Sequence, residues 1–147
     1  MTVEKEINIH ISPFIQIGAI LSMMLIWIGG GIGLSKLGVL TENPHFPWLV
    51  SASMLLFFAI FNCAFSLNAP DANKYWLHSI ISYVILVITA ASLAYLITGI
   101  SIYEARSMKW MYFVFSFGYL VFLSIVNFMR IIVKIAQRED NSLRGDR

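Results

Sequence analysis

Four long apolar stretches divide the chain, at about residues 13–34, 47–67, 76–100 and 108–136. Each one meets or exceeds the roughly 20 residues that a helix needs to cross a hydrocarbon core of about 30 Å. The apolar positions are continuous rather than alternating, which favours helices over the strands of a closed barrel. The pattern therefore predicts an all-α, polytopic membrane protein with four transmembrane helices.

The segments between these stretches are too short to hold a soluble domain. Short links force consecutive helices to run antiparallel, so we expect an up-down bundle of four helices. The bundle should form a single integral membrane domain, 1–147, that ends in a short basic cytoplasmic tail, 137–147. The links lie at residues 35–46, 68–75 and 101–107.

Residues typical of helix starts precede the apolar stretches. Pro13 and Pro47 fit the first helical turn, where a missing N–H costs nothing. Asp71 or Asn73 is expected to cap the third helix, and Ser107 the fourth.

Composition indicates the same class of protein. Apolar residues make up 59% of the chain and charged residues 12%, whereas soluble domains carry roughly 45–50% and 25%. A chain this short cannot hide so much apolar surface in its own core, so we expect lipid around it. The compact form favours the bacterial inner (plasma) membrane, with an organellar membrane as the alternative. A net charge of +2 provides no large basic face, so we expect no nucleic-acid partner.

The first helix carries small residues at helical spacing. Gly18, Ser22, Gly29 and Gly33 are 4, 7 and 4 positions apart and therefore share one face, whereas Gly31 lies off it. Lipid provides no hydrophobic force between helices, so small residues that let two backbones approach mark an interface. We expect this helix-packing face to contact another helix, either of this chain or of a second chain.

Polar residues also recur at helical spacing in the other three helices, which places them on single faces. In the fourth helix the stripe is Tyr112, Ser116, Tyr119, Leu123, Asn127, Arg130 and Lys134. In the third helix a weaker stripe is His78, Ser82, Ile85, Thr89 and Ser92. In the second helix the set is Ala59, Asn62 and Ser66.

Several polar residues should share the inner third of the bilayer, where polar groups usually face the interior of a bundle. We therefore expect a polar cluster around Arg130. Three interpretations stay open: hydrogen bonding between helices with an arginine that extends to the head groups, a pocket for a lipid head group, anion or solute, and contact with a partner subunit. The cluster comprises Gln16, Asn62, Ser66, His78, Ser82, Asn127 and Arg130.

The sequence contains no arrangement typical of catalysis or of a bound cofactor. No Asp or Glu lies inside any of the four stretches, so paired carboxylates for acid–base chemistry are missing. Neither a GxSxG nor an HExxH motif occurs, and of the three histidines only His78 begins a helix of the core. Cys63 is the single cysteine and forms no disulfide within the chain. We therefore expect no catalytic residues, no metal site and no cofactor.

These observations favour a non-enzymatic subunit or interaction protein of a membrane complex. Its expected partners are membrane lipids, including anionic ones, and other membrane protein subunits or a second copy of itself. One alternative is a small oligomeric channel or carrier that uses the polar cluster as an anion or solute site at the cytoplasmic ends of the helices. The other is an enzyme that acts on a membrane-soluble substrate such as a lipid or quinone.

The positions of lysine and arginine predict the orientation of the chain, because cytoplasmic segments carry an excess of both. The side with the two termini and the second link has Lys5, Lys74, Arg130, Lys134, Arg138, Arg144 and Arg147. The other side has Lys36, Arg106 and Lys109. Both termini should therefore be cytoplasmic. The outer interface should then be marked by Trp48, Tyr103 and Trp110, and the inner one by Tyr75 and Trp76.

Cysteine labelling tests this orientation. In a Cys63→Ala background, a cysteine at His45 should react with a membrane-impermeant maleimide in intact cells, because the first link should face outward. A cysteine at Lys74, in the second link, is the control and should react only after the membrane is permeabilised. The reverse labelling pattern would contradict the predicted orientation.

Overall fold

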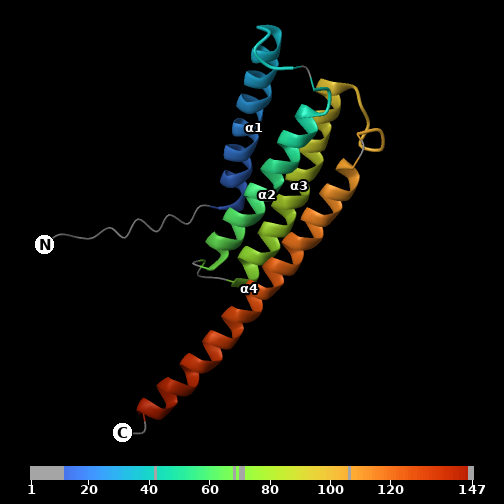
Figure 1. The fold of residues 1–147 in the computed structure, drawn as a ribbon. Coiled ribbons are helices and arrows are strands. Elements are labelled where there is room, and N and C mark those ends of the chain that lie inside the picture. The colour runs from blue at the N-terminus through green and yellow to red at the C-terminus, as the bar shows by residue number, and fades with distance from the viewer. Residues whose placement is uncertain (1–11, 42, 68, 70–71, 106, 146–147) are drawn as a thin grey trace, which may run out of the picture.

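The computed structural model describes residues 12–41, 43–67, 69, 72–105 and 107–145, and within them it consists of four helices joined by short links. The helices are α1 (Pro13–Lys36), α2 (Phe46–Leu67), α3 (Ala72–Thr98) and α4 (Met108–Gly145). They run alternately up and down (Figure 1). The predicted fold class, an all-α bundle of four helices, is confirmed.

All four helices are long and apolar enough to cross a membrane. Their exposed surface is rich in large apolar side chains, which water would not favour but lipid accommodates. The chain is therefore a small integral membrane protein. The end of the bundle at which α1 begins in Figure 1 is called the lower end, and the opposite end is called the upper end.

The helix ends follow local chemistry. Gly38 and Gly99 adopt φ values of +74° and +67°, in the left-handed region that glycine tolerates, and they end α1 and α3. The third helix begins at Ala72, earlier than predicted, so Asn73 is helical and does not cap it; Asp71 lies outside the described residues. Ser107 immediately precedes α4, as expected, and its carbonyl accepts the N–H groups of Trp110 and Met111, both at 3.1 Å.

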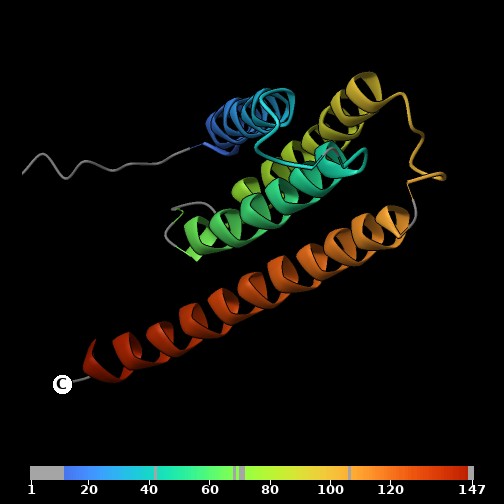
Figure 2. The ribbon, with the colours of Figure 1, turned by 45° about the horizontal axis from the view of Figure 1, so that its top comes forward.

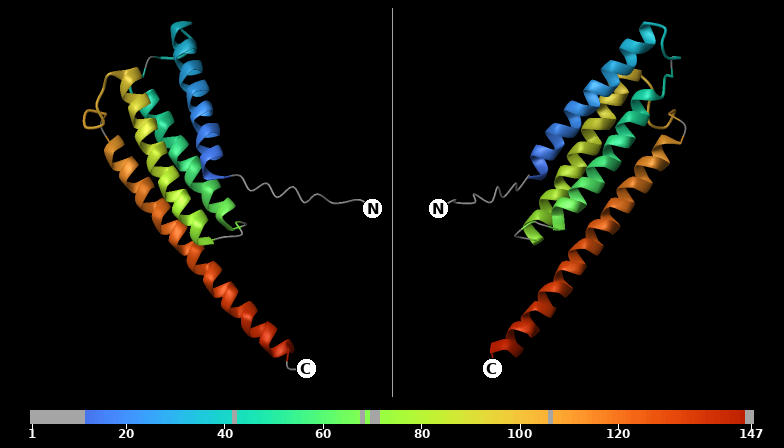
Figure 3. Two further views of the ribbon diagram at one scale, coloured as in Figure 1. Left: turned by 180° about the vertical axis from the view of Figure 1, so that it is seen from behind. Right: turned by 60° about the vertical axis from the view of Figure 1, so that its left-hand side comes forward.

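The fourth helix is longer than the predicted stretch, which ended at about residue 136, because α4 continues to Gly145. Gln, Arg and Glu residues favour a helix, and the part beyond residue 136 has no proline and no glycine before Gly145. An exposed ion pair between Asp140 and Arg144, which are one turn apart, stabilises the helix slightly. At 38 residues the helix is about 57 Å long, well beyond the thickness of a hydrocarbon core. Its last part projects past the lower end of the bundle (Figure 3).

The bundle has three layers, with α1 and α4 on opposite sides of the α2–α3 pair (Figure 2). Among the described residues, α1 and α4 do not contact each other, whereas α2 contacts every other helix. Half of the most apolar stretch of α2 is buried, against 11% to 28% for the other three helices. The position of α1 relative to α4 is therefore set through the central pair.

Aromatic side chains fill much of the interior. The Tyr83 and Tyr119 rings stack with their centroids 4.3 Å apart, and Phe58 lies against both. Near the upper end, Trp48 packs edge-on against Tyr112 at 5.9 Å. Trp48 Nε1 also donates a hydrogen bond of 3.2 Å to the carbonyl oxygen of Ile100, which ties α2 to the link after α3. Trp48 is thus an interior residue and does not face the membrane interface.

Replacing Trp48 tests whether it acts as a packed interior residue or as a residue of the membrane interface. Trp48 is 1% exposed and Trp110, also near the upper end, is 64% exposed. Trp48→Phe should lower the free energy of unfolding by about 1–3 kcal/mol, because it removes the bond to Ile100 and leaves a void. Trp110→Phe should leave it unchanged. Thermal unfolding in detergent, followed by circular dichroism, measures both; equal melting temperatures would contradict this role for Trp48.

Candidate functional site

One side chain from each helix meets in the lower half of the bundle. Gln16 Nε2 of α1 donates to Tyr75 Oη of α3 at 3.2 Å. Asn62 Nδ2 of α2 donates to Gln16 Oε1 at 3.2 Å and to Tyr75 Oη at 3.4 Å. Tyr119 Oη of α4 donates to Asn62 Oδ1 at 3.0 Å. We call Gln16, Asn62, Tyr75 and Tyr119 the four-helix network.

The four-helix network is enclosed by the bundle, since each of its side chains is at most 7% exposed. Asn62 is at its centre and uses both its amide nitrogen and its amide oxygen. Lipid would provide no partner for these groups, so each must be satisfied within the protein. Hydrogen bonds between membrane helices contribute on the order of 0.6–2 kcal/mol each. The network therefore fixes α1 and α4 relative to the central pair.

Further polar pairs continue from the network towards the upper end. Tyr83 Oη and Ser116 Oγ are 3.1 Å apart, joining α3 to α4. The hydroxyl groups of Ser51 and Tyr112 form a short hydrogen bond between α2 and α4. Much of the polar interior is therefore paired across helix interfaces.

The predicted polar cluster divides between this network and other positions. Gln16 and Asn62 belong to the network, and Ser66 is buried about one turn after Asn62. Ser82 is fully buried in α3, and its hydroxyl has no partner among the described residues. Asn127 is half-buried on α4.

The two ionisable members of the predicted cluster lie at its margins. His78 lies beside α1, with its ring centroid 5.9 Å from that of Phe14 and Nδ1 2.9 Å from the Lys74 carbonyl oxygen. The Arg130 guanidinium donates to the carbonyl oxygen of Ala69, just beyond the end of α2, at 3.1 Å. Arg130 is also close enough to Tyr75 for electrostatic interaction. It therefore joins α4 to the lower end of the bundle beside the network.

The polar stripe predicted for the fourth helix faces the bundle down to Arg130, whereas of the stripe predicted for the third helix only Ser82 is buried. Thr89 and Ser92 are directed outward and donate to carbonyl groups of their own helix, both at 2.7 Å. Such a bond satisfies a hydroxyl group on the outside of the helix, so a polar residue at helical spacing need not face the bundle. The predicted stripe did not allow for this. The buried face is instead Tyr75, Ser79, Ser82, Leu86, Ala90 and Ala94.

Tyr75 is the network member that the sequence analysis missed, because it was assigned to the membrane interface. Its spacing of four from Ser79 and seven from Ser82 was the available signal, since these positions share a helical face. Tyr119 was placed on the fourth-helix stripe but not in the cluster.

The small-residue face of α1 is directed away from the bundle. Gly18, Ser22, Gly29 and Gly33 are all exposed. A Cβ atom added at any of the three glycines would meet nothing within 4 Å. The Gly31 position differs, because a Cβ there would collide with the Phe46 ring of α2. The sequence left open whether this face contacts another helix of this chain or a helix of a second chain. Among the described residues, it contacts no other helix of this chain.

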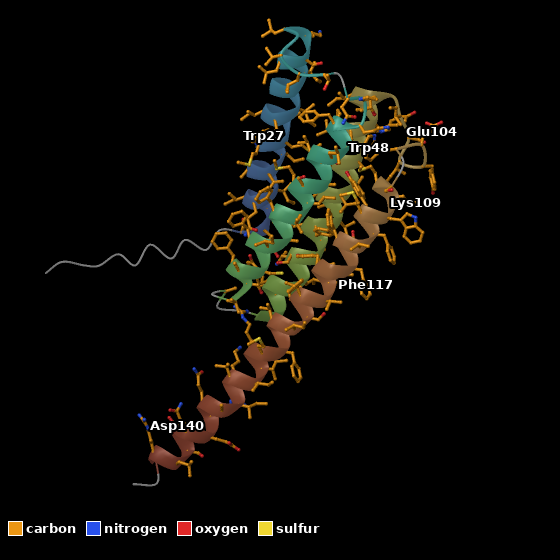
Figure 4. All side chains as sticks on the ribbon, in the orientation of Figure 1. Trp27, Trp48, Glu104, Lys109, Phe117 and Asp140 are labelled. Carbon is orange, nitrogen blue, oxygen red and sulfur yellow. The ribbon has the colours of Figure 1, made fainter. Side chains whose placement is uncertain are left out.

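Exposed aromatic side chains elsewhere are directed towards the surroundings, as Trp27 on α1 and Phe117 on α4 show (Figure 4). Over the described ranges, no three His, Cys, Asp or Glu side chains gather in a way that could hold a metal ion. Comparisons with protein-family models, with curated proteins and with solved structures found no match.

The four-helix network predicts a specific stability effect. Asn62→Leu should lower the free energy of unfolding by about 1–3 kcal/mol, because Gln16 and Tyr119 each lose their bond to the amide. Ser124→Ala is the control, since Ser124 is exposed and bonds only within its own helix, to Leu120. Denaturation in mixed micelles measures both variants. An Asn62→Leu protein as stable as Ser124→Ala would show that the network contributes nothing.

Proposed function

We propose that this protein is a non-catalytic subunit of a membrane complex that binds a partner helix through the small-residue face of α1. One contrast carries the proposal. Several polar side chains of the interior pair with one another, from Gln16 and Asn62 to Tyr83 and Ser116. The small-residue face, in contrast, is exposed, and a Cβ atom added at its glycines would meet no other described part of the chain.

The chemistry of this face suits close helix packing. The Ser22 hydroxyl donates to the Gly18 carbonyl at 2.8 Å, so its polar group needs no outside partner. The three glycines leave a smooth surface along which a second backbone can approach. Each glycine costs the helix about 1 kcal/mol relative to alanine. A face that only touched lipid would gain nothing in return.

The interior supports a subunit better than a carrier. A carrier must offer polar groups to its solute, whereas Asn62 and Tyr119 already bind each other at 3.0 Å at the centre of the bundle. The partner helix belongs to another membrane protein or to a second copy of this chain. Lys134 and Arg138, towards the end of α4, provide a contact for anionic lipid, whereas Arg144 pairs with Asp140.

Substitutions on two sides of α1 test the proposal. Gly29→Leu and Gly33→Leu should reduce the complex extracted in mild detergent about tenfold or more, and leave the melting temperature of the isolated chain unchanged. Gly31→Leu should lower that melting temperature, because the side chain displaces Phe46 from its place against α1. Native gel electrophoresis and thermal unfolding measure the two effects. Complexes of unchanged size and amount in both outer-face variants would contradict the proposal.

Cross-linking identifies the partner. In a Cys63→Ala background, a benzophenone attached to a cysteine at Gly33 should capture a second polypeptide. A cysteine at Leu34 is the matched control, because Leu34 is at nearly the same depth and exposed but lies on another side of α1. A product of twice the chain mass assigns the partner as a second copy, and any other mass assigns another subunit. Equal capture from both positions would contradict a specific face.

A further inference from the structure

A cleft of about 710 Å³ opens at the upper end of the bundle, between the last turns of α1, the start of α2 and the end of α3. The volume lies within the range of about 300–1,000 Å³ that small-molecule sites occupy. None of the residues that line the cleft is a small residue of the outer face of α1 or a member of the four-helix network, so a role for the cleft does not rest on the proposed function.

The cleft begins where the packing of α1 ends. Lower along α1, Met24 and Ile28 are buried against Val50, Met54 and Ala90 of α2 and α3. Above them, the Phe46 ring lies against the backbone of Gly31, which is possible only because Gly31 has no side chain. The residues after Gly31 on α1 are mostly exposed, and Ile32 is among those that line the cleft. The base of the cleft is therefore well packed, and its upper part is open.

The lining of the cleft is divided by polarity. Its walls include the apolar side chains of Ile32, Phe46 and Ile97, one from each of α1, α2 and α3. Lys36, Thr41 and Asn43, on the last turn of α1 and the link after it, supply an ammonium, a hydroxyl and an amide. These are hydrogen-bond donors, and one carries a full positive charge. Apolar walls beside cationic and neutral donors fit an amphiphile with an acidic head.

The carbonyl groups at the end of α1, beside the cleft, are paired within the chain. The last carbonyl groups of α1, those of Gly33, Leu34 and Ser35, accept hydrogen bonds from the N–H groups of residues 37–39 at 3.0–3.1 Å. Their negative partial charge is thereby reduced at the site where Lys36 lies. The start of α2 and the ends of α1 and α3 all line the cleft, and their partial charges oppose one another. The preference for an anion therefore rests on Lys36 and on the donors of Thr41 and Asn43.

We propose that this cleft binds a lipid-like molecule with an acidic head group. Its alkyl chain lies against Ile32, Phe46 and Ile97, and its carboxylate or phosphate is held by Lys36 and the donors of Thr41 and Asn43. A free fatty acid and an anionic phospholipid share this chemistry. The length of α1 places Lys36 near a membrane surface, which is the depth at which such head groups lie.

Binding to the full-length protein tests the site. Purified protein should be titrated in nanodiscs of phosphatidylcholine that contain either oleic acid or phosphatidylglycerol, with retained molecules counted by native mass spectrometry. Lys36→Gln should weaken retention of the acidic molecule about tenfold, because the head group loses its cation. Lys109→Gln is the matched control, since Lys109 is also exposed near the upper end but lies over the Tyr103 ring at 5.3 Å, outside the cleft. Retention in this variant should not change.

A second substitution tests the alkyl part of the site. Ile97→Trp should fill the cleft and prevent retention of either molecule, with the melting temperature measured alongside. If Ile97→Trp does not fold, the Lys36 and Lys109 pair decides alone. Stronger retention of oleic acid assigns a carboxylate head and stronger retention of phosphatidylglycerol assigns a phosphate. Equal losses in Lys36→Gln and Lys109→Gln, or full retention in a folded Ile97→Trp protein, would overturn the proposal.

Discussion

Lipid offers no hydrogen-bond partners, and this constraint governs how the chain is arranged. Backbone groups meet it by forming helices. Side chains meet it through contacts such as those of Asn62, which links Gln16 of α1 to Tyr119 of α4 although these two helices do not touch among the described residues. Asn62 can reach both because α2 contacts each of the other three helices. A single amide on α2 thus connects the two outer helices.

A second consequence concerns the surfaces. The features proposed to bind partners lie on the outside: the small-residue face of α1, the projecting part of α4 and the cleft at the upper end. These differ in chemistry. The face of α1 has no polar group in need of a partner, the end of α4 carries charged side chains of both signs, and the cleft combines Lys36 with apolar walls. The proposed partners are a helix for the face of α1, anionic lipid for the end of α4 and an amphiphile for the cleft.

The sequence predicted the fold well because crossing a bilayer sets the length and apolar character of each helix. It also placed the bundle-facing stripe of the fourth helix, from Tyr112 to Arg130. It failed on the third helix, since Thr89 and Ser92 are as polar as Ser79 but bind their own backbone. It also placed Tyr75 at an interface, because an aromatic hydroxyl near a helix end fits either a head group or a buried amide. Which helices pair through Gln16 and Asn62 depends on packing in three dimensions, which spacing along one helix does not determine.

The central claim is that the chain works as part of a larger assembly, with a closed interior and an outer face made for another helix. The most direct measurement is the mass of the particle that the unmodified protein forms when taken from its own membrane into nanodiscs without detergent. We expect a particle with at least one further polypeptide beyond this 16.6 kDa chain and its lipids. A particle with a single copy of the chain and lipid alone would contradict the claim.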